Sequence, residues 1–213
     1  MSAAPPSAIG TTADATSAPA NVQRERIVAA ALELLAAGGV AKLTTRTIGD
    51  RVGLHNSSLF HHFASKREIV GAVLARVNDG LVQRLAPLAA EREPALETLV
   101  AVVLRLSDHY AANRAEARCA LRLLLDPDGL DDEHGARFTT ILWSWLARAQ
   151  ASGAIRPVHV TQAARNLLGI LLMDPVWTSR TPRGARDDER RRSELVAFVR
   201  GALAPQRPSP EQR

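Results

Sequence analysis

Apolar side chains recur with helical spacing along most of the chain, between residues 27 and 203. In the first such segment, Ile27, Ala30, Ala31, Leu34 and Leu35 follow the i, i+3, i+4, i+7, i+8 pattern of one helix face, and a Gly-Gly pair ends the segment. No stretch alternates apolar and polar residues for long enough to indicate a strand. The pattern therefore predicts an all-α protein.

Start and stop signals divide the rest of this pattern into further helices. Ser65 and Glu68 have the spacing of a capping box at the start of a long helix, and Pro94 suits the first turn of the next. Asp131 and Asp132 begin another helix, which Gly153 ends. Shorter apolar stripes at 120–125, 160–172 and 195–203 predict three more helical segments.

The two ends of the chain lack such stripes. Residues 1–21 are rich in Ala, Ser, Thr and Pro, with Asp14 as their one charged side chain, and residues 205–213 contain three prolines. We expect a disordered arm and a disordered tail there. The remainder divides into an N-terminal three-helix helix-turn-helix domain (22–70) and a larger C-terminal helical domain (71–204).

The helix-turn-helix is predicted at residues 44–63, which read TTRTIGDRVGLHNSSLFHHF. Thr44 can cap the first helix, and Ile48 and Val52 form its buried face. Gly49 is small enough for the second helix to cross close by, and Gly53 can adopt the positive φ that a tight turn requires. Any short, glycine-linked pair of helices in a bundle has similar spacing, so spacing alone leaves that alternative open.

The second helix, at about residues 56–62, would be the recognition helix. The residues that are predicted to face outward are short or polar, and none is acidic: Asn56, Ser57, Ser58 and His61, with His62 as a further candidate. Such side chains can hydrogen-bond base edges in the major groove of double-stranded DNA. Arg24 and Arg26 could reach a phosphate from the arm, or could simply lie at an exposed helix start.

Residues 26–70 resemble the DNA-binding domain of the TetR (tetracycline-repressor-like) family. That family's pattern contains Thr-x-x-x-Ile-Ala, Ala-Gly-Val-Ser, Leu-Tyr-x-His-Phe and Ser-Lys-x-x-Leu. This chain has Thr44 with Ile48-Gly49, then Val52-Gly53-Leu54-His55, Leu59-Phe60-His61-His62-Phe63 and Ser65-Lys66-Arg67-Glu68-Ile69. Many positions match at the right spacing, so the match is specific.

The resemblance implies how these residues meet DNA. Thr45 and Arg46 would touch phosphate or an adjacent base, Asn56, Ser57 and Ser58 would face bases, and His61 would contact backbone or base. Lys66 would meet a phosphate at the start of the following helix, where free N–H groups attract anions. The alternative interpretation is that Lys66 is only a solvated charge after the helix cap. The chain would be a repressor that a small-molecule effector releases from a palindromic operator. A TetR-like activator and a ligand-independent DNA-binding protein remain alternatives.

Four residues depart from the family pattern, and one of them is Ser57, which stands where Gly is usual. Phe60 stands where Tyr is usual and therefore lacks a hydroxyl for phosphate. His55 replaces the usual capping Ser, and Gly49 replaces Ala at about 1 kcal/mol of helix propensity. The operator sequence therefore cannot be predicted from the family.

The C-terminal domain has a second row of residues on the helix near 160–177, at i, i+4, i+7 and i+11: Asn166, Ile170, Met173 and Trp177. A helix that is apolar on two faces is deeply buried or packs against another subunit. With Phe198 on the last helix, this row predicts a homodimer interface of two helices from each chain. Two recognition helices would then reach successive major grooves, roughly 34–36 Å apart.

Polar groups beside apolar faces in the same domain would bind the effector. The candidates are Arg105, His109, Tyr110, Cys119, Arg122 and the off-stripe Trp143. Solvated or satisfied core groups are the alternative for each, and Trp143 could equally lie at the subunit contact.

Composition and charge narrow the class of protein. The net charge of +5 permits a nucleic-acid partner. Cys119 is the single cysteine, so no intramolecular disulfide can form. No segment approaches the ~20 apolar residues of a membrane span, and the start lacks a secretory signal. We therefore expect a soluble, cytoplasmic protein without a membrane partner.

An all-helical enzyme is the competing class. The adjacent His61 and His62 point in different directions on a helix, and no His-Glu-x-x-His motif, phosphate loop or nucleophile elbow occurs. Residues 187–192, three acidic residues followed by three arginines, are interpreted as a solvated charge run. We predict no enzymatic activity, no cofactor and no metal.

Overall fold

The computed structural model describes residues 17–125, 132–177 and 185–205, with side chains at 21–121, 139–173 and 187–205. These residues form nine α-helices, one 3-10 turn and no strand, so the all-α prediction is confirmed for the described part of the chain. The elements are α1 (Ser17–Gly38), η1 (Val40–Lys42), α2 (Thr45–Val52), α3 (Asn56–His62), α4 (Lys66–Ala90), α5 (Leu96–Ala112), α6 (Arg114–Leu125), α7 (Asp132–Ala151), α8 (Val160–Trp177) and α9 (Ala185–Leu203).

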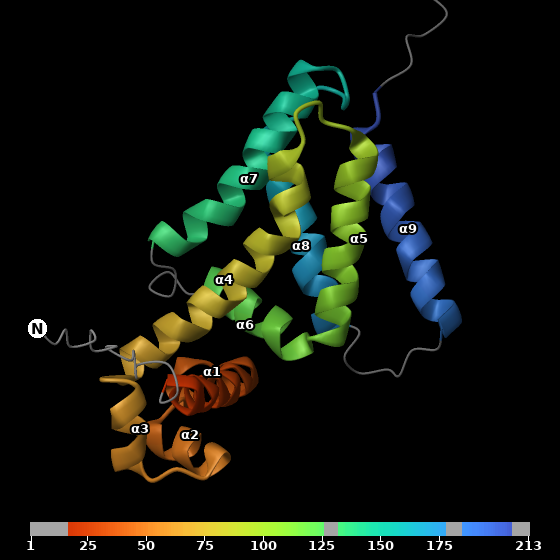
Figure 1. The fold of residues 1–213 in the computed structure, drawn as a ribbon. Coiled ribbons are helices and arrows are strands. Elements are labelled where there is room, and N and C mark those ends of the chain that lie inside the picture. The colour runs from red at the N-terminus through yellow and green to blue at the C-terminus, as the bar shows by residue number, and fades with distance from the viewer. Residues whose placement is uncertain (1–16, 126–131, 178–184, 206–213) are drawn as a thin grey trace, which may run out of the picture.

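The first three helices form a small unit at the lower end of the molecule (Figure 1). Its core combines Ile27 and Leu35 of α1, Ile48 of α2, Leu59 of α3 and Phe63, all nearly inaccessible to water. Burial of such side chains stabilises by about 1.5–3 kcal/mol each. This packing holds α2 and α3 against α1 and leaves their outer faces exposed.

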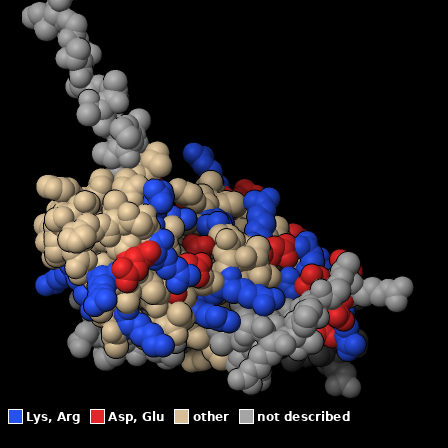
Figure 2. Space-filling view, turned by 90° about the horizontal axis from the view of Figure 1, so that it is seen from below, with Lys and Arg blue, Asp and Glu red and all other residues tan. Residues whose placement is uncertain are grey.

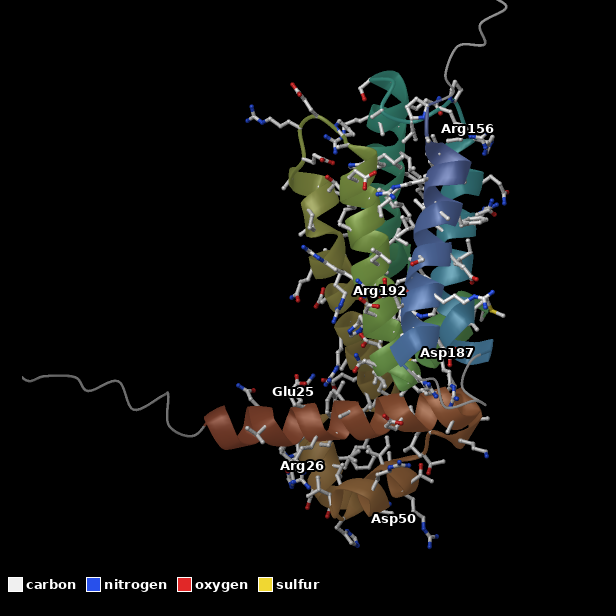
Figure 3. The ribbon with its side chains drawn as sticks, turned by 90° about the vertical axis from the view of Figure 1, so that its right-hand side faces the viewer. Glu25, Arg26, Asp50, Arg156, Asp187 and Arg192 are labelled. Atoms are coloured by element: carbon white, nitrogen blue, oxygen red, sulfur yellow. The ribbon has the colours of Figure 1, made fainter. Side chains whose placement is uncertain are left out.

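The remaining helices form a bundle above this unit. The long α4 rises into it, α5, α8 and α9 run alongside one another, and α7 flanks α4 (Figure 1). The bundle core contains Leu85, Leu99, Leu106, Trp145 and Leu167. Seen from the side, α1 lies across the lower end of the bundle (Figure 3).

Two helices belong to both cores. The first turns of α4 contribute Ile69 and Val77 to the lower core, while its later turns contribute Leu85 to the bundle. On α6, Cys119 is buried in the lower core and Ala117 in the bundle core. The bundle and the lower unit are therefore joined through the packing of these two helices.

Three predicted boundaries differ from the structure. Helix α1 begins at Ser17, inside the predicted arm of residues 1–21, because Pro19 falls in the first turn, where its missing N–H leaves no hydrogen bond unmade. Helix α5 begins at Leu96 with Ala95 as its cap, so Pro94 precedes the helix. The boundary expected at residue 70 falls inside α4, whose residues to Val77 still pack in the lower core. Residues 1–16 and 206–213, the rest of the predicted arm and tail, lie outside the described residues.

The run of charges at 187–192 was predicted to be solvated, but two of its arginines contact α5. Arg191 is largely buried and bonds Ser107 and Asp108 of α5, and Arg192 also pairs with Asp108. The run therefore fastens the first turns of α9 to α5. The partners lie more than 80 residues apart in the chain, so the sequence pattern did not indicate them.

Candidate nucleic-acid interface

The first helix of the motif, α2, begins with a reciprocal cap. The Thr44 hydroxyl accepts from the Thr47 N–H at 3.0 Å, and the Thr47 hydroxyl accepts from the Thr44 N–H, also at 3.0 Å. The predicted cap at Thr44 is confirmed. The role of Thr47 was missed because a capping box usually has Glu or Gln at that position.

Both glycines of the motif are needed by the turn after α2. Gly53 has φ of 71°, and its N–H bonds the Gly49 carbonyl, as does the N–H of Leu54. A Cβ on Gly49 would lie 2.6 Å from the Leu54 carbonyl oxygen. The closest neighbour of Gly49 is therefore the turn, while the second helix contributes the Asn56 Oδ1 atom at 3.7 Å from the same Cβ position.

The recognition helix, α3, exposes four side chains: Asn56, Ser57, Phe60 and His61. Three of them are predicted DNA contacts, and none is acidic. Ser58, also predicted to face bases, is half-buried. Phe60 was not among the predicted contacts, because its side chain lacks the hydroxyl that the family's usual Tyr offers to phosphate. In the sequence it is an apolar residue that lies off the buried stripe of Leu59 and Phe63.

His55 occupies the position before α3 but makes no side-chain cap to it. Its Nδ1 instead lies 3.3 Å from the Ser57 hydroxyl. This agrees with the departure noted from the family pattern, in which Ser is usual at that position.

The first turn of α2 places Arg46 in solvent, with Thr45 half-buried beside it. Both are on the element that precedes the recognition helix. From residue 42 to residue 67 the chain has five Lys or Arg side chains and one acidic residue, Asp50. The face of the molecule seen from below carries more blue than red, with a broad uncharged area at its left (Figure 2).

Lys66 begins α4, and its ammonium group donates to the Val40 carbonyl at 3.1 Å. An ammonium has three hydrogens, so two remain for other acceptors. The Ser65 hydroxyl accepts from the Glu68 N–H at 3.2 Å, as predicted for a cap. Glu68 completes it by accepting from the Ala64 N–H at 2.7 Å, one residue earlier than in a standard capping box.

Arg24 on α1 fixes the end of the recognition helix. Its guanidinium lies 3.9 Å above the Phe63 ring, donates to the His62 carbonyl and pairs with Glu68 at 2.9 Å. The hydrogen bond from Arg24 and then that from the Ala64 N–H lower the pKa of Glu68. The idea that Arg24 reaches a phosphate is therefore not supported; it is a positioning residue.

Arg26 is also occupied within the protein. It points from α1 toward the helix-turn-helix (Figure 3) and donates to the Val52 carbonyl at 3.2 Å and to Gln23 at 2.8 Å. Its contact satisfies a carbonyl in the last turn of α2. Both arginines thus hold α2 and α3 against α1.

The five candidate effector ligands whose side chains are described do not gather at one site. Arg105 is exposed on α5, and Cys119 is buried against the lower unit. Arg122 is in α6, but its side chain lies outside the described residues. Trp143 is half-buried, and its indole N–H is buried without a partner.

His109 and Tyr110 lie together near the end of α5. His109 Nε2 is 2.6 Å from Glu116 of α6, and its Nδ1 is 2.8 Å from Arg84 of α4. Burial, followed by the Glu116 charge, raises the pKa of Tyr110 to about 12. This cluster joins α4, α5 and α6.

The row predicted for subunit contact lies partly on the surface. Met173 of α8 and Phe198 of α9 are 37% and 51% exposed, Asn166 is exposed and Ile170 is half-buried. Asn166 and Phe198 line one cleft of about 260 Å³. The Trp177 side chain lies outside the described residues.

Within the described ranges, no helix is both long enough and apolar enough to cross a membrane. Among the same residues, no three His, Cys, Asp or Glu side chains are grouped as metal ligands would be.

Residues 27–73 match the family described as bacterial regulatory proteins, tetR family. The chain is 29% identical over 140 residues to the nucleoid occlusion factor SlmA of Marinobacter nauticus, covering 63% of this chain and 69% of that protein. It is 40% identical over 52 residues to the class C tetracycline repressor protein of Escherichia coli, but these are 24% of each chain.

The fold is shared with solved structures over most of the chain. The ketosteroid transcriptional regulator KstR2 of Mycobacterium tuberculosis superimposes with a TM-score of 0.68 at 23% identity, covering 86% of this chain and 96% of that one. The fold match thus extends well beyond residues 27–73 and includes the helical bundle.

Proposed function

The chain belongs to the TetR family of DNA-binding transcriptional regulators, which is not a family of enzymes, and we propose that it is a homodimeric repressor released from a palindromic operator by a small-molecule effector. One observation carries this proposal: α3 exposes an uncharged polar face between cations on α2 and at the start of α4. Uncharged hydrogen-bonding groups suit base edges, and flanking cations suit phosphates.

The contacts divide by chemistry. Asn56, Ser57 and His61 on α3 would read base edges, with Ser58 at the margin. Arg46, beside Thr45, and Lys66 would meet phosphates, since Arg46 is exposed and Lys66 keeps two hydrogens for an acceptor.

Salt dependence tests the phosphate contacts. The duplex would be selected by the wild-type protein from a pool randomised in its central region, and its affinity measured at several salt concentrations. A dimer that loses one phosphate contact in each subunit should lose about 2 from the slope of log affinity against log salt. Arg46→Ala and Lys66→Ala should each show this loss. Arg92→Ala, which removes an exposed cation just beyond the C-terminal end of α4, is the matched control and should leave the slope unchanged.

The dimer would form through α8 and α9. Met173 and Phe198 are large apolar side chains left in solvent, and the cleft that joins Asn166 to Phe198 shows that the two helices share one surface. Ile170, which is half-buried, would extend this surface along α8. Phe198→Glu should give a monomer by light scattering at micromolar concentration, whereas Val22→Glu, an exposed apolar residue on α1, should stay dimeric. A dimeric Phe198→Glu protein would exclude this surface.

The effector would act through the helices shared by the two cores. Binding near Arg105, His109, Tyr110, Arg122 or Trp143 would displace α4 or α6 and thereby tilt α1 and the recognition helix. Cys119 would move with α6 from its place in the lower core. A compound that releases DNA must have its own affinity lowered by DNA by the same factor. A compound that releases DNA, but whose own affinity for the protein is unchanged by DNA, would contradict this coupling.

A ligand-independent DNA-binding role is the second candidate. The relative that matches the largest share of the chain among those described is named as a nucleoid occlusion factor, not as a regulator of transcription. Mapping the bound sites on the source genome separates the two roles. Sites confined to promoters support the repressor, and sites dispersed through coding regions support the alternative.

A further inference from the structure

An aromatic ring stands in solvent on the recognition helix. Phe60 is 50% exposed, on the same outward face as Asn56 and Ser57, which precede it by four and three residues. It belongs to neither hydrophobic core, whereas its neighbours Leu59 and Phe63 are buried in the lower one.

Half of the ring's surface is open to solvent. Among the described residues, the cation–π contact of this unit joins Arg24 to Phe63, and the aromatic pair joins His109 to Tyr110, so neither involves Phe60. The adjacent exposed side chains are the polar groups of Asn56, Ser57 and His61. An apolar ring on this polar face gains its contact from whatever the face binds.

The major groove offers one apolar group to such a ring, the C5-methyl of thymine, and contact with that methyl distinguishes thymine from the other bases. We propose that Phe60 is a specificity-determining residue that reads a thymine methyl in each half-site of the operator. This inference rests on the proposed binding of operator DNA. It assigns to Phe60 a base contact, since its side chain has no hydroxyl with which to bond a phosphate.

The size of the effect follows from the area that the contact removes from water. Burial of one methyl-sized group is worth about a fourfold change in affinity, and two half-sites give about 15-fold. An isolated effect of this size is measurable because replacing thymine by deoxyuridine removes the methyl and keeps every hydrogen-bonding group of the base.

The test is a deoxyuridine scan of the duplex selected by the wild-type protein. One thymine in each half-site should lose about fourfold in affinity on replacement. The Phe60→Ala protein should bind the thymine and deoxyuridine duplexes equally at that position, while His61→Ala should retain the wild-type preference. Phe60 is exposed, so its replacement leaves both cores intact, and thermal melting of the variant should match the wild type.

The outcomes distinguish a failure of the Phe60 assignment from a failure of the proposed operator binding on which it rests. If the wild-type protein enriches no duplex, operator binding itself is contradicted. If it enriches one, but no thymine position depends on its methyl, or the dependence persists in Phe60→Ala, the assignment of Phe60 alone is overturned.

Discussion

Glu91 lies where α4 ends, and its carboxylate joins three elements of the bundle. It accepts from the Trp145 indole N–H at 2.8 Å and from the Thr98 hydroxyl at 2.5 Å. Arg148 of α7 donates to the carbonyls of Glu91 and Leu88 at 2.6 and 3.0 Å and so satisfies the last turn of α4. We expect this junction to be a main support of the bundle.

Removing the carboxylate should cost more than one hydrogen bond. Trp145 is fully buried, so Glu91→Ala leaves an indole N–H unpaired in the core, at about 1–3 kcal/mol. Glu91→Gln keeps an acceptor for Trp145, and its amide can donate to Thr98, so it should cost less. A double-mutant cycle of Glu91→Ala with Trp145→Phe should give a coupling of about 1.5–3 kcal/mol, the range for a hydrogen bond to a charged group.

The assay is urea unfolding followed by circular dichroism, at one protein concentration because a dimer's stability depends on concentration. Additive effects of the two replacements, within about 0.5 kcal/mol, would show that the Glu91–Trp145 bond contributes nothing and would refute this reasoning.

The pH dependence of stability provides an independent measure of the Glu91 junction. Partial burial raises the pKa of Glu91, but hydrogen bonds from Thr98, Trp145 and the Ala95 backbone, with the charge of Arg148, outweigh it and leave the pKa below 4.5. The stabilisation by the ionised carboxylate is thus complete above pH 4.5 and is lost as the pH falls through the lowered pKa. The difference in stability between wild type and Glu91→Gln should shrink over that acid range. A difference that stays constant would contradict it.

Three further predictions concern single residues. Gly53→Ala should destabilise the protein by about 1–2 kcal/mol, because φ of 71° strains any L side chain. Gly71→Ala, on an exposed face of α4 with open space for a Cβ, should stabilise it by up to about 1 kcal/mol. Urea unfolding measures both changes, and changes of the same sign would contradict the different roles of the two glycines. Thr44→Val should cost about 1 kcal/mol of α2 capping, with Thr45→Val as the control that should cost less. Tyr110, the one tyrosine, should titrate by ultraviolet absorbance near its pKa of about 12 in the folded protein; titration near 10 would show that it is not buried.

The helix-turn-helix was largely predictable because its determinants are local. Thr44, Gly53 and Ser65 each act within a few residues of themselves, through a cap or a turn. The same rules located the helices from apolar spacing. Helix starts were less accurate, since Pro19 is compatible with a first turn and the sequence gives no reason to prefer that over a disordered arm.

Residues that act across the fold were not predictable. Arg24 is separated from Phe63 and Glu68 by about 40 residues, and Arg191 from Ser107 by more than 80. An arginine near the chain's start is equally compatible with solvent, phosphate or a carboxylate until the fold places its partner. The candidate effector residues show the same difficulty, because polar groups beside apolar faces occur on several helices without converging.

The insertion of Cys119 into the lower core limits how this protein can be divided and recombined. A fragment ending at residue 70 would lack Val73, Leu74 and Val77 as well as the α6 side chain that covers α1. A chimaera that carries the helix-turn-helix onto another bundle must therefore bring a compatible α6 with it. The lower unit and the bundle are not interchangeable modules, and exchange between relatives should succeed only where both contact surfaces of α4 and α6 are transferred together.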